Sequence, residues 1–167
     1  PVPARAGHTF MRDAVIRSDA IFGGESSGHY YLRALDAGDD GFFVATLVLD
    51  YLMRTCRQLS DIRRDWPRIF ITPELRLPVE PDARDEVLRL IDAEWGDRSI
   101  ERMDGLRVRF DDGWALIRPS LTEQKMICRV EGDNDHALER IMAELCDILK
   151  PIADPLWQVY AESLVGE

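Results

Sequence analysis

Residues 104–117 read DGLRVRFDDGWALI and predict two strands with turns at their ends. From 106 to 110, apolar side chains alternate with two arginines, which is the period of a strand that buries one face. Ile100–Met103 is a strand candidate before it, and Asp104-Gly105 between the two is a strong signal for a two-residue hairpin turn. Asp111-Asp112-Gly113 is a second turn, into residues 114–117. Consecutive short turns of this kind predict an antiparallel sheet.

Two more segments of the C-terminal part have the pattern of strands. Residues 75–79 alternate in the same way, and Pro73 and Pro78 favour an edge position because proline cannot donate to a neighbouring strand. Residues 125–131 are a further strand candidate.

Helices are expected between and after these strands. Pro81–Trp95 and Asp133–Lys150 carry apolar stripes at helical spacing, and residues 156–164 suit a short helix. We therefore predict an α+β fold, with a four-stranded, mainly antiparallel sheet packed by helices on one face.

The N-terminal part has a different character. Gly7–Ser18 is predicted as a helix and Ala20–Phe22 as a short strand, which leads into a glycine-rich loop over residues 23–31. Gly41–Gln58 is apolar on nearly all faces, so this predicted helix needs burial on more than one side. Asp39 or Asp40 is placed to cap it.

Composition limits the classes of function. The 167 residues are 46% apolar and carry a net charge of −10, which excludes wholesale disorder and disfavours nucleic acid as a partner. Three cysteines without paired spacing indicate reduced thiols, and neither a signal peptide nor a membrane-spanning run is visible, so we expect a cytoplasmic protein that does not enter a membrane. The chain begins at Pro1, and we interpret it as part of a longer polypeptide.

The first candidate for chemistry is the loop Gly24-Glu25-Ser26-Ser27-Gly28-His29. Carboxylate and hydroxyl groups suit the vicinal hydroxyls of a sugar, because glutamate accepts hydrogen bonds and serine both donates and accepts them. Glycines allow the backbone to approach a ligand closely. The alternative is a solvated polar turn without a ligand.

The second candidate is Arg118-Pro119-Ser120-Leu121-Thr122-Glu123-Gln124-Lys125. Arginine offers a planar fork for two phosphate oxygens, and hydroxyls and successive backbone N–H groups add donors. The alternative is an ordinary loop between two strands. Because the whole chain is acidic, an anion would need a local basic pocket such as this one. No spacing of cysteine, histidine or aspartate predicts a metal site.

Taken together, the two loops resemble the C-terminal part of the α-D-phosphohexomutases, in the phosphomannomutase/phosphoglucomutase branch. The two loops stand in the same order as in that family, and further matching segments lie between and around them. These segments are Gly7-His8, Asp40-Gly41, Ile71-Thr72-Pro73-Glu74 and Gly113-Trp114. The resemblance implies that residues 1–58 are the end of the third domain, 59–67 a hinge or linker, and 68–167 the fourth domain.

The resemblance also implies a reaction. The family interconverts hexose 1-phosphate and hexose 6-phosphate through a bisphosphorylated sugar, using a phosphoserine in the first domain and Mg²⁺ held by an aspartate loop in the second. Neither loop is in this sequence. We therefore expect no bound cofactor here, no activity of this part alone, and two kinds of partner, namely hexose phosphates and the upstream domains of the same enzyme.

Residue roles carry over at the positions that match. Glu25 and Ser27 correspond to the pair that holds the C3 and C4 hydroxyls of the sugar, and His29 to the histidine that closes that loop. His8 corresponds to a histidine that is a candidate for assisting proton transfer, and so is the one catalytic candidate. The phosphate that is not reacting would be gripped by Arg118, Ser120 and Thr122.

Some positions depart from the family pattern. Leu121 stands where glycine or asparagine is usual, Gln124 where proline is usual, and Ser26 where methionine or glutamine is common. Two other interpretations stay open: a phosphoglucosamine mutase fragment, and a non-catalytic module that binds sugar phosphates or serves only as an interaction domain.

Overall fold

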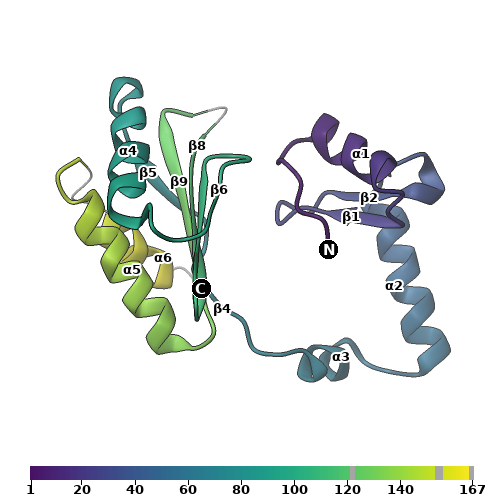
Figure 1. Ribbon diagram of the computed structural model, residues 1–167. Coiled ribbons are helices and arrows are strands. Elements are labelled where there is room, and N and C mark those ends of the chain that lie inside the picture. The colour runs from purple at the N-terminus through teal and green to yellow at the C-terminus, as the bar shows by residue number, and fades with distance from the viewer. Residues whose placement is uncertain (121–122, 153–155, 166–167) are drawn as a thin grey trace. The chain divides into compact units, whose positions relative to one another are not determined.

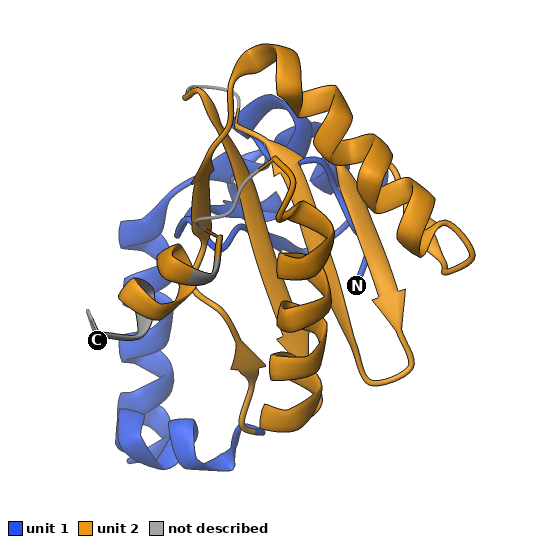
Figure 2. Ribbon diagram, turned by 90° about the vertical axis from the view of Figure 1, so that its left-hand side faces the viewer, with its two compact units in different colours: residues 1–67 blue, residues 68–167 orange. Residues whose placement is uncertain are grey.

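The computed structural model describes residues 1–120, 123–152 and 156–165. The chain divides into two compact units, Pro1–Pro67 and Arg68–Glu167, which are drawn in blue and orange in Figure 2. Across the described residues, no helix is both long enough and apolar enough to cross a membrane.

The first unit is built on a small antiparallel sheet. Helix α1 (His8–Arg17) packs on the strands β1 (Phe22–Gly24), β2 (Tyr30–Leu32) and β3 (Gly38–Asp39), which lie in that order. A single 3-10 turn, η1 (Arg33–Leu35), joins β2 to β3. Met11 and Val15 of α1 pack against Tyr31 and Ala37, which gives the unit a core of four buried residues.

Strand β1 lies further along the chain than predicted. It includes Gly23 and Gly24, which the sequence analysis assigned to the loop. The reason is packing: a Cβ atom on Gly23 would lie 2.7 Å from Cγ2 of Val15, so this glycine lets the helix approach the strand. The turn begins only at Glu25, where Gly28 takes a φ of 86°.

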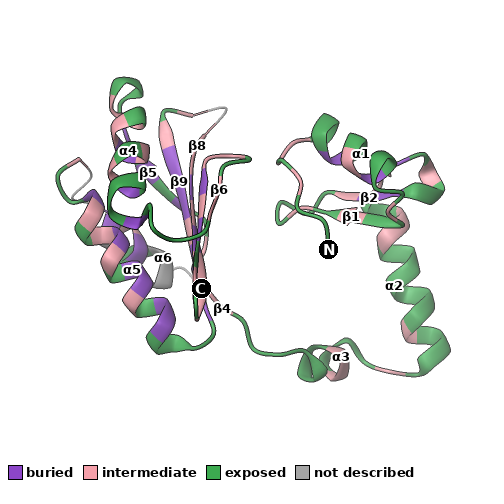
Figure 3. Cartoon of the chain, viewed as in Figure 1, coloured by how far each residue is buried: buried purple, intermediate pink, exposed green. Residues whose placement is uncertain are grey.

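Two helices complete the first unit. In α2 (Gly41–Thr55), the Oδ1 atom of Asp40 accepts a hydrogen bond from the Phe43 N–H at 2.8 Å, so the predicted cap is present. None of the residues in α2 is buried, which Figure 3 shows as a largely green helix. Helix α3 (Leu59–Asp65) occupies most of the segment 59–67 that was expected to be a linker.

The second unit contains a six-stranded antiparallel sheet. The strands lie in the order β4-β9-β8-β7-β6, and β5 also pairs with β9, next to β4. Their bounds are β4 (Phe70–Ile71), β5 (Leu75–Pro78), β6 (Ile100–Glu101), β7 (Leu106–Phe110), β8 (Gly113–Pro119) and β9 (Lys125–Gly132). The prediction of four strands was wrong. Strand β6 lies within the predicted strand at Ile100–Met103 and is shorter than expected. Strand β4 was not predicted, because its two residues are too few for an alternating pattern to appear in the sequence.

Helices cover one face of this sheet, as predicted (Figure 1). The turn η2 (Pro81–Ala83) leads into α4 (Arg84–Trp95), and α5 (Asp135–Leu149) is capped by the side chain of Asn134. Helix α6 (Leu156–Val165) packs against β5 and α5. The core between sheet and helices includes the buried residues Leu75, Leu77, Val87, Ile91, Trp95, Val108, Ile117, Met126, Ile141, Met142, Leu145 and Leu149.

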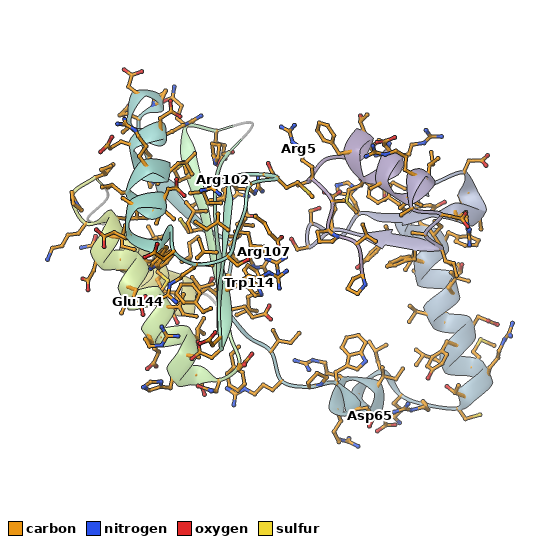
Figure 4. All side chains as sticks on the ribbon, in the orientation of Figure 1. Arg5, Asp65, Arg102, Arg107, Trp114 and Glu144 are labelled. Carbon is orange, nitrogen blue, oxygen red and sulfur yellow. The ribbon has the colours of Figure 1, made fainter. Side chains whose placement is uncertain are left out.

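The opposite face of the sheet carries both charged and apolar side chains, with Arg107 opposite Leu116 and Arg118 opposite Ile127. The guanidinium of Arg107 lies over the ring of Trp114, 4.6 Å from its centroid, on the side away from the helices (Figure 4). Such a contact lets a charged side chain cover apolar surface while its charge stays near water.

The turn between β6 and β7 is longer than predicted. The register Glu101↔Arg107 leaves residues 102–105 as the connection rather than Asp104-Gly105 alone. Gly105 has a φ of 86°, and a Cβ atom there would lie 2.3 Å from the Ile117 carbonyl oxygen and 2.5 Å from Cβ of Arg118. Only glycine fits at this place, where the turn packs against the end of β8.

Candidate functional site

The carboxylate of Glu25 is fixed by two donors within the first unit. Its Oε1 accepts from the backbone N–H of Gly7 at 2.9 Å, and its Oε2 accepts from the hydroxyl of Tyr31 at 2.9 Å. Gly7 is the N-cap of α1, so the negative charge lies at the positive end of that helix. Each oxygen keeps a further lone pair, and Glu25 is only half-buried, so the group can accept hydrogen bonds from a ligand.

His29 is oriented by a carboxylate from the next strand. Its Nδ1 lies 2.6 Å from Oδ2 of Asp39, while Oδ1 of Asp39 accepts from the Tyr30 N–H at 2.9 Å. The hydrogen bond and charge of Asp39 raise the pKa of His29 above 6.5. The Tyr30 N–H and then His29 lower the pKa of Asp39. Each group therefore favours the charged form of the other, at the edge of the loop.

The other predicted residues of the first unit belong to the same cluster. The turn that carries Ser27 is closed by Glu25 N–H to the His29 carbonyl and by Gly28 N–H to the Glu25 carbonyl, both at 3.0 Å. Ser27 is exposed on this turn. His8 is exposed at the start of α1, and its ring centroid lies 5.5 Å from that of Tyr31. The structure thus brings Glu25, Ser27, His29 and His8 together.

Arg118 lies near the end of β8, in the second unit. Its side chain is 20% exposed, and its Nη2 lies 4.0 Å from Oε2 of Glu74. Two contacts fix the backbone of Arg118. It pairs with Ile127 of β9, and Gly105 packs against it. The guanidinium is therefore held largely within the unit, and a part of it remains accessible.

The loop after β8 is held by hydrogen bonds at Ser120 and at Glu123. The Ser120 N–H donates to the Lys125 carbonyl at 2.9 Å, and the Ser120 Oγ accepts from the Glu123 N–H at 3.1 Å. From outside the loop, Nη2 of Arg84 donates to the Glu123 carbonyl at 2.8 Å. The predicted residue Thr122, like Leu121, lies outside the described residues.

Side-chain charges around this loop form one connected network. Glu123 Oε2 lies 3.2 Å from Nη1 of Arg76 and 3.3 Å from Nζ of Lys125, and Arg76 Nη2 lies 3.1 Å from Oε1 of Glu74. Adding Arg84 and Arg118 gives four cations against two carboxylates. In a chain of net charge −10, this is a local basic site at which an anion can bind.

Several members of these clusters were not predicted from the sequence. Tyr31 and Asp39 in the first unit and Arg76, Arg84 and Glu74 in the second make the contacts that orient the predicted residues. Tyr31 could have been found, because it follows His29 by two positions on a strand. Arg76 and Arg84 could not, since only the folded unit brings β5 and the start of α4 to residue 123. Within the described part of the chain, no group of three or more histidine, cysteine, aspartate or glutamate residues could hold a metal ion.

Comparison with known proteins decides the family. Residues 1–69 match the model of phosphoglucomutase/phosphomannomutase, alpha/beta/alpha domain III, and residues 74–148 match that of phosphoglucomutase/phosphomannomutase, C-terminal domain. The chain belongs to the phosphoglucomutase/phosphomannomutase family. The predicted resemblance is thereby confirmed, and the two loops lie one in each matched domain.

Family members of several names are similar to this chain. The phosphomannomutase/phosphoglucomutase of Pseudomonas aeruginosa is 31% identical over 159 residues, 93% of this chain and 34% of the relative. A phosphoglucomutase of Neisseria meningitidis is 30% identical (92% and 34%), and a probable phosphoglucosamine mutase of Pyrococcus horikoshii is 28% identical (93% and 35%). The chain spans about a third of the length of these curated relatives.

A solved structure of the family agrees with the fold. A phosphoglucomutase/phosphomannomutase family protein from Burkholderia thailandensis superimposes with a TM-score of 0.72 and 28% identity, over 88% of this chain and 31% of that one. The mixed α/β fold with antiparallel sheets is therefore that of the family.

Proposed function

We propose that this chain supplies two substrate-binding loops of a phosphohexomutase, an enzyme that interconverts hexose 1-phosphate and hexose 6-phosphate through a bisphosphorylated sugar. The loop around Glu25, Ser27 and His29 binds sugar hydroxyls. The loop around Arg118, Ser120 and Thr122 binds the phosphate that is not being transferred. The proposal rests mainly on one observation: within this family, a fixed carboxylate lies in one matched domain and a basic cluster lies in the other.

The hydroxyl-binding half is supported by the chemistry of the Glu25 turn. Two internal donors fix the carboxylate and leave acceptor capacity on both oxygens. An exposed serine follows two positions later, and His29 carries a raised pKa at the same turn. Vicinal hydroxyls both donate and accept, so a carboxylate beside a hydroxyl and an imidazole matches them.

The phosphate-binding half is supported by charge. Four cations surround two carboxylates at the Arg118 loop, and a dianionic phosphate can replace carboxylate contacts to Arg76, Lys125 and Arg118. In the reaction, the sugar turns over between two half-reactions. One anion clamp and one hydroxyl clamp must therefore serve both orientations, and holding both ends orients the attacking hydroxyl.

Other parts of the reaction belong to the complete enzyme. The phosphoserine and the Mg²⁺ loop that the family resemblance implies are not in this sequence, so we propose that the chain does not complete the reaction by itself. His8 is proposed to assist proton transfer. It is exposed, and its ring lies beside that of Tyr31, next to the carboxylate of Glu25.

Ligand titration of the ¹⁵N-labelled chain tests the proposal. Glucose 1-phosphate is expected to shift the amides of the Glu25 turn and of the Arg118 loop, whereas inorganic phosphate shifts only the second set. If the chain is folded and neither set responds to millimolar glucose 1-phosphate, the proposed function is wrong. A parallel titration with glucosamine 1-phosphate tests the phosphoglucosamine mutase alternative. That alternative is supported by the similarity to the probable phosphoglucosamine mutase of Pyrococcus horikoshii.

The Arg118→Ala variant should lose the phosphate response. In a complete enzyme that contains this chain, we expect a strongly raised KM and a lowered kcat, together about 10- to 100-fold in kcat/KM, because a charge-assisted contact of about 1.5–3 kcal/mol orients both half-reactions. Steady-state kinetics with glucose 1-phosphate measure this. Unchanged kinetics would remove Arg118 from the site.

The Glu25→Ala variant should weaken glucose and mannose substrates alike, since the two sugars share the hydroxyls at C3 and C4 that we assign to Glu25. About a tenfold loss in kcat/KM for each is expected from the loss of a hydrogen bond to a charged group. A loss confined to one of the two sugars would contradict the assignment.

A further inference from the structure

Tyr31 touches two of the candidate site residues, although it is fully buried and cannot reach a ligand itself. Its hydroxyl donates to Oε2 of Glu25 at 2.9 Å, and its ring centroid lies 5.5 Å from that of His8. The same ring packs with Met11, Val15 and Ala37 in the core of the first unit. The side chain therefore links the rigid part of the unit to the exposed groups.

A glutamate side chain has several rotatable bonds, and its ordering has a cost in conformational entropy. With the Gly7 N–H as its only donor, the carboxylate of Glu25 could rotate about that single contact. The second donor, on the opposite oxygen, removes this freedom. Both donors come from outside the turn that carries Glu25, one from the N-cap of α1 and one from β2.

Burial, followed by the hydrogen bond to Glu25, raises the pKa of Tyr31 to about 12. The phenol is therefore protonated throughout the working range of pH and can act toward Glu25 as a donor. The carboxylate keeps one free acceptor direction on each oxygen.

We propose that Tyr31 is a positioning residue, whose hydroxyl holds Glu25 in the one orientation that accepts hydrogen bonds from the sugar. This inference rests on the proposed function. Its specific content is that the hydroxyl of Tyr31 contributes to sugar binding only through Glu25.

The chain provides a matched control in the neighbouring residue. Tyr30 belongs to the same strand, but its ring stacks on Phe22 at a centroid distance of 5.9 Å, and it is only half-buried. Tyr31→Phe and Tyr30→Phe therefore remove the same atom from adjacent positions of β2, and only the first removes a donor to Glu25.

The first measurement needs no ligand. The amide of Gly7 reports the position of the Glu25 carboxylate, to which it donates. In the ¹⁵N-labelled full chain, Tyr31→Phe should move this amide signal upfield and increase its hydrogen exchange by about tenfold, the size of one lost hydrogen bond. Tyr30→Phe should leave it unchanged. If the Gly7 amide is the same in wild type and both variants, the proposal is wrong.

The second measurement uses glucose 1-phosphate. Tyr31→Phe should weaken its binding by about three- to tenfold, and Tyr30→Phe by less than about twofold. In the Glu25→Ala background, Tyr31→Phe should have no further effect, because a residue that acts only through Glu25 shows complete coupling with it. An additive loss in the double variant would overturn the proposal, since it would mean that Tyr31 acts by another route.

A third measurement guards against a variant that does not fold. The hydroxyl proton of Tyr31, buried and bonded, should give a slowly exchanging signal in the wild type that disappears in Glu25→Ala. A signal that persists unchanged would show that this hydrogen bond is absent, and would overturn the proposal. Failure of the proposed function looks different: Glu25→Ala would then leave glucose 1-phosphate binding unchanged, whatever the Gly7 amide does.

Discussion

The two units of this chain differ in how far each buries its own apolar surface. In Arg68–Glu167, helices and sheet enclose a large core that includes Ile91, Ile117 and Leu145. In Pro1–Pro67, the core has only four buried members, and α2 buries none of its residues. Phe42 is 89% exposed and Met53 is 79% exposed on that helix. The second unit is thus complete as a folding unit, whereas the first displays a surface of the kind that proteins normally cover.

A pocket on α2 and α3 shows where the first unit leaves apolar surface exposed. It has a volume of about 730 Å³ and is lined almost entirely by apolar side chains, including Val44, Leu47, Tyr51 and Trp66. The candidate site residues around Glu25 lie instead on the side of the unit formed by α1 and β2, where the four-residue core is. The comparison teaches that a turn with well-ordered polar contacts does not require that the whole unit around it be well buried.

Separating the units should have the largest effect. We expect residues 68–167 alone to unfold cooperatively with the same midpoint as in the intact chain, because their core is internal. Residues 1–67 should unfold at a lower temperature and bind the dye ANS through the exposed face of α2. Circular dichroism melts and dye fluorescence measure both.

The intact chain serves as the control for this separation, and it should show two transitions in that order. A single transition shared by both halves would contradict the comparison, since it would mean that each unit depends on the other for its stability.

A pair of leucines sharpens the same contrast at single residues. Leu145→Ala, in the core face of α5, should lower the free energy of unfolding of the second unit by about 2–5 kcal/mol. Leu49→Ala, on α2 where the leucine is 59% exposed, should change the stability of the first unit by no more than about 0.5 kcal/mol. Denaturant titrations that follow each transition provide the values, and a large loss in Leu49→Ala would show that α2 is covered in solution.

The smallest effect concerns the pair His29 and Asp39. The pKa of His29 is raised, so its contribution to stability is complete below pH 6.5 and is lost as the pH rises through the raised value. The pKa of Asp39 is lowered, so its contribution is present above 3.8 and is lost as the pH falls through the lowered value. The first unit should therefore be most stable between these limits, and less so in high salt.

An NMR titration of the His29 ring tests this pair. The pKa should lie above 6.5 in the wild type and return toward 6.5 in Asp39→Asn. An unchanged titration in that variant would remove Asp39 as the cause.

Sequence reasoning succeeded where the signal was local. The alternation in residues 106–110, the apolar stripe of α5 and the cap at Asp40 each depend on neighbours in the chain, and each is present in the structure. It failed where a distant contact decides the outcome. Gly23 was assigned to a loop, because its close approach to Val15 cannot be seen in the sequence. Strand β4 was not predicted, because its two residues are recognised as a strand only by their pairing with β9.

The same distinction applies to the candidate site. The residue types in the two loops could be read from the sequence, and the family follows from them and from the comparisons. Apart from Tyr31, which follows the loop directly, the groups that orient them could not be predicted, because Arg84 lies 39 residues from Glu123 and Gly7 lies 18 residues from Glu25.

The hydrogen bond from Arg84 to the Glu123 carbonyl has a mechanical consequence. Arg84 is the first residue of α4, and that helix is anchored by the buried side chains of Val87, Ile91 and Trp95. The segment at Glu123 is thereby fixed to a helix that is packed into the core of its unit. A displacement of this unit would therefore carry the basic cluster around Glu123 with it as one body.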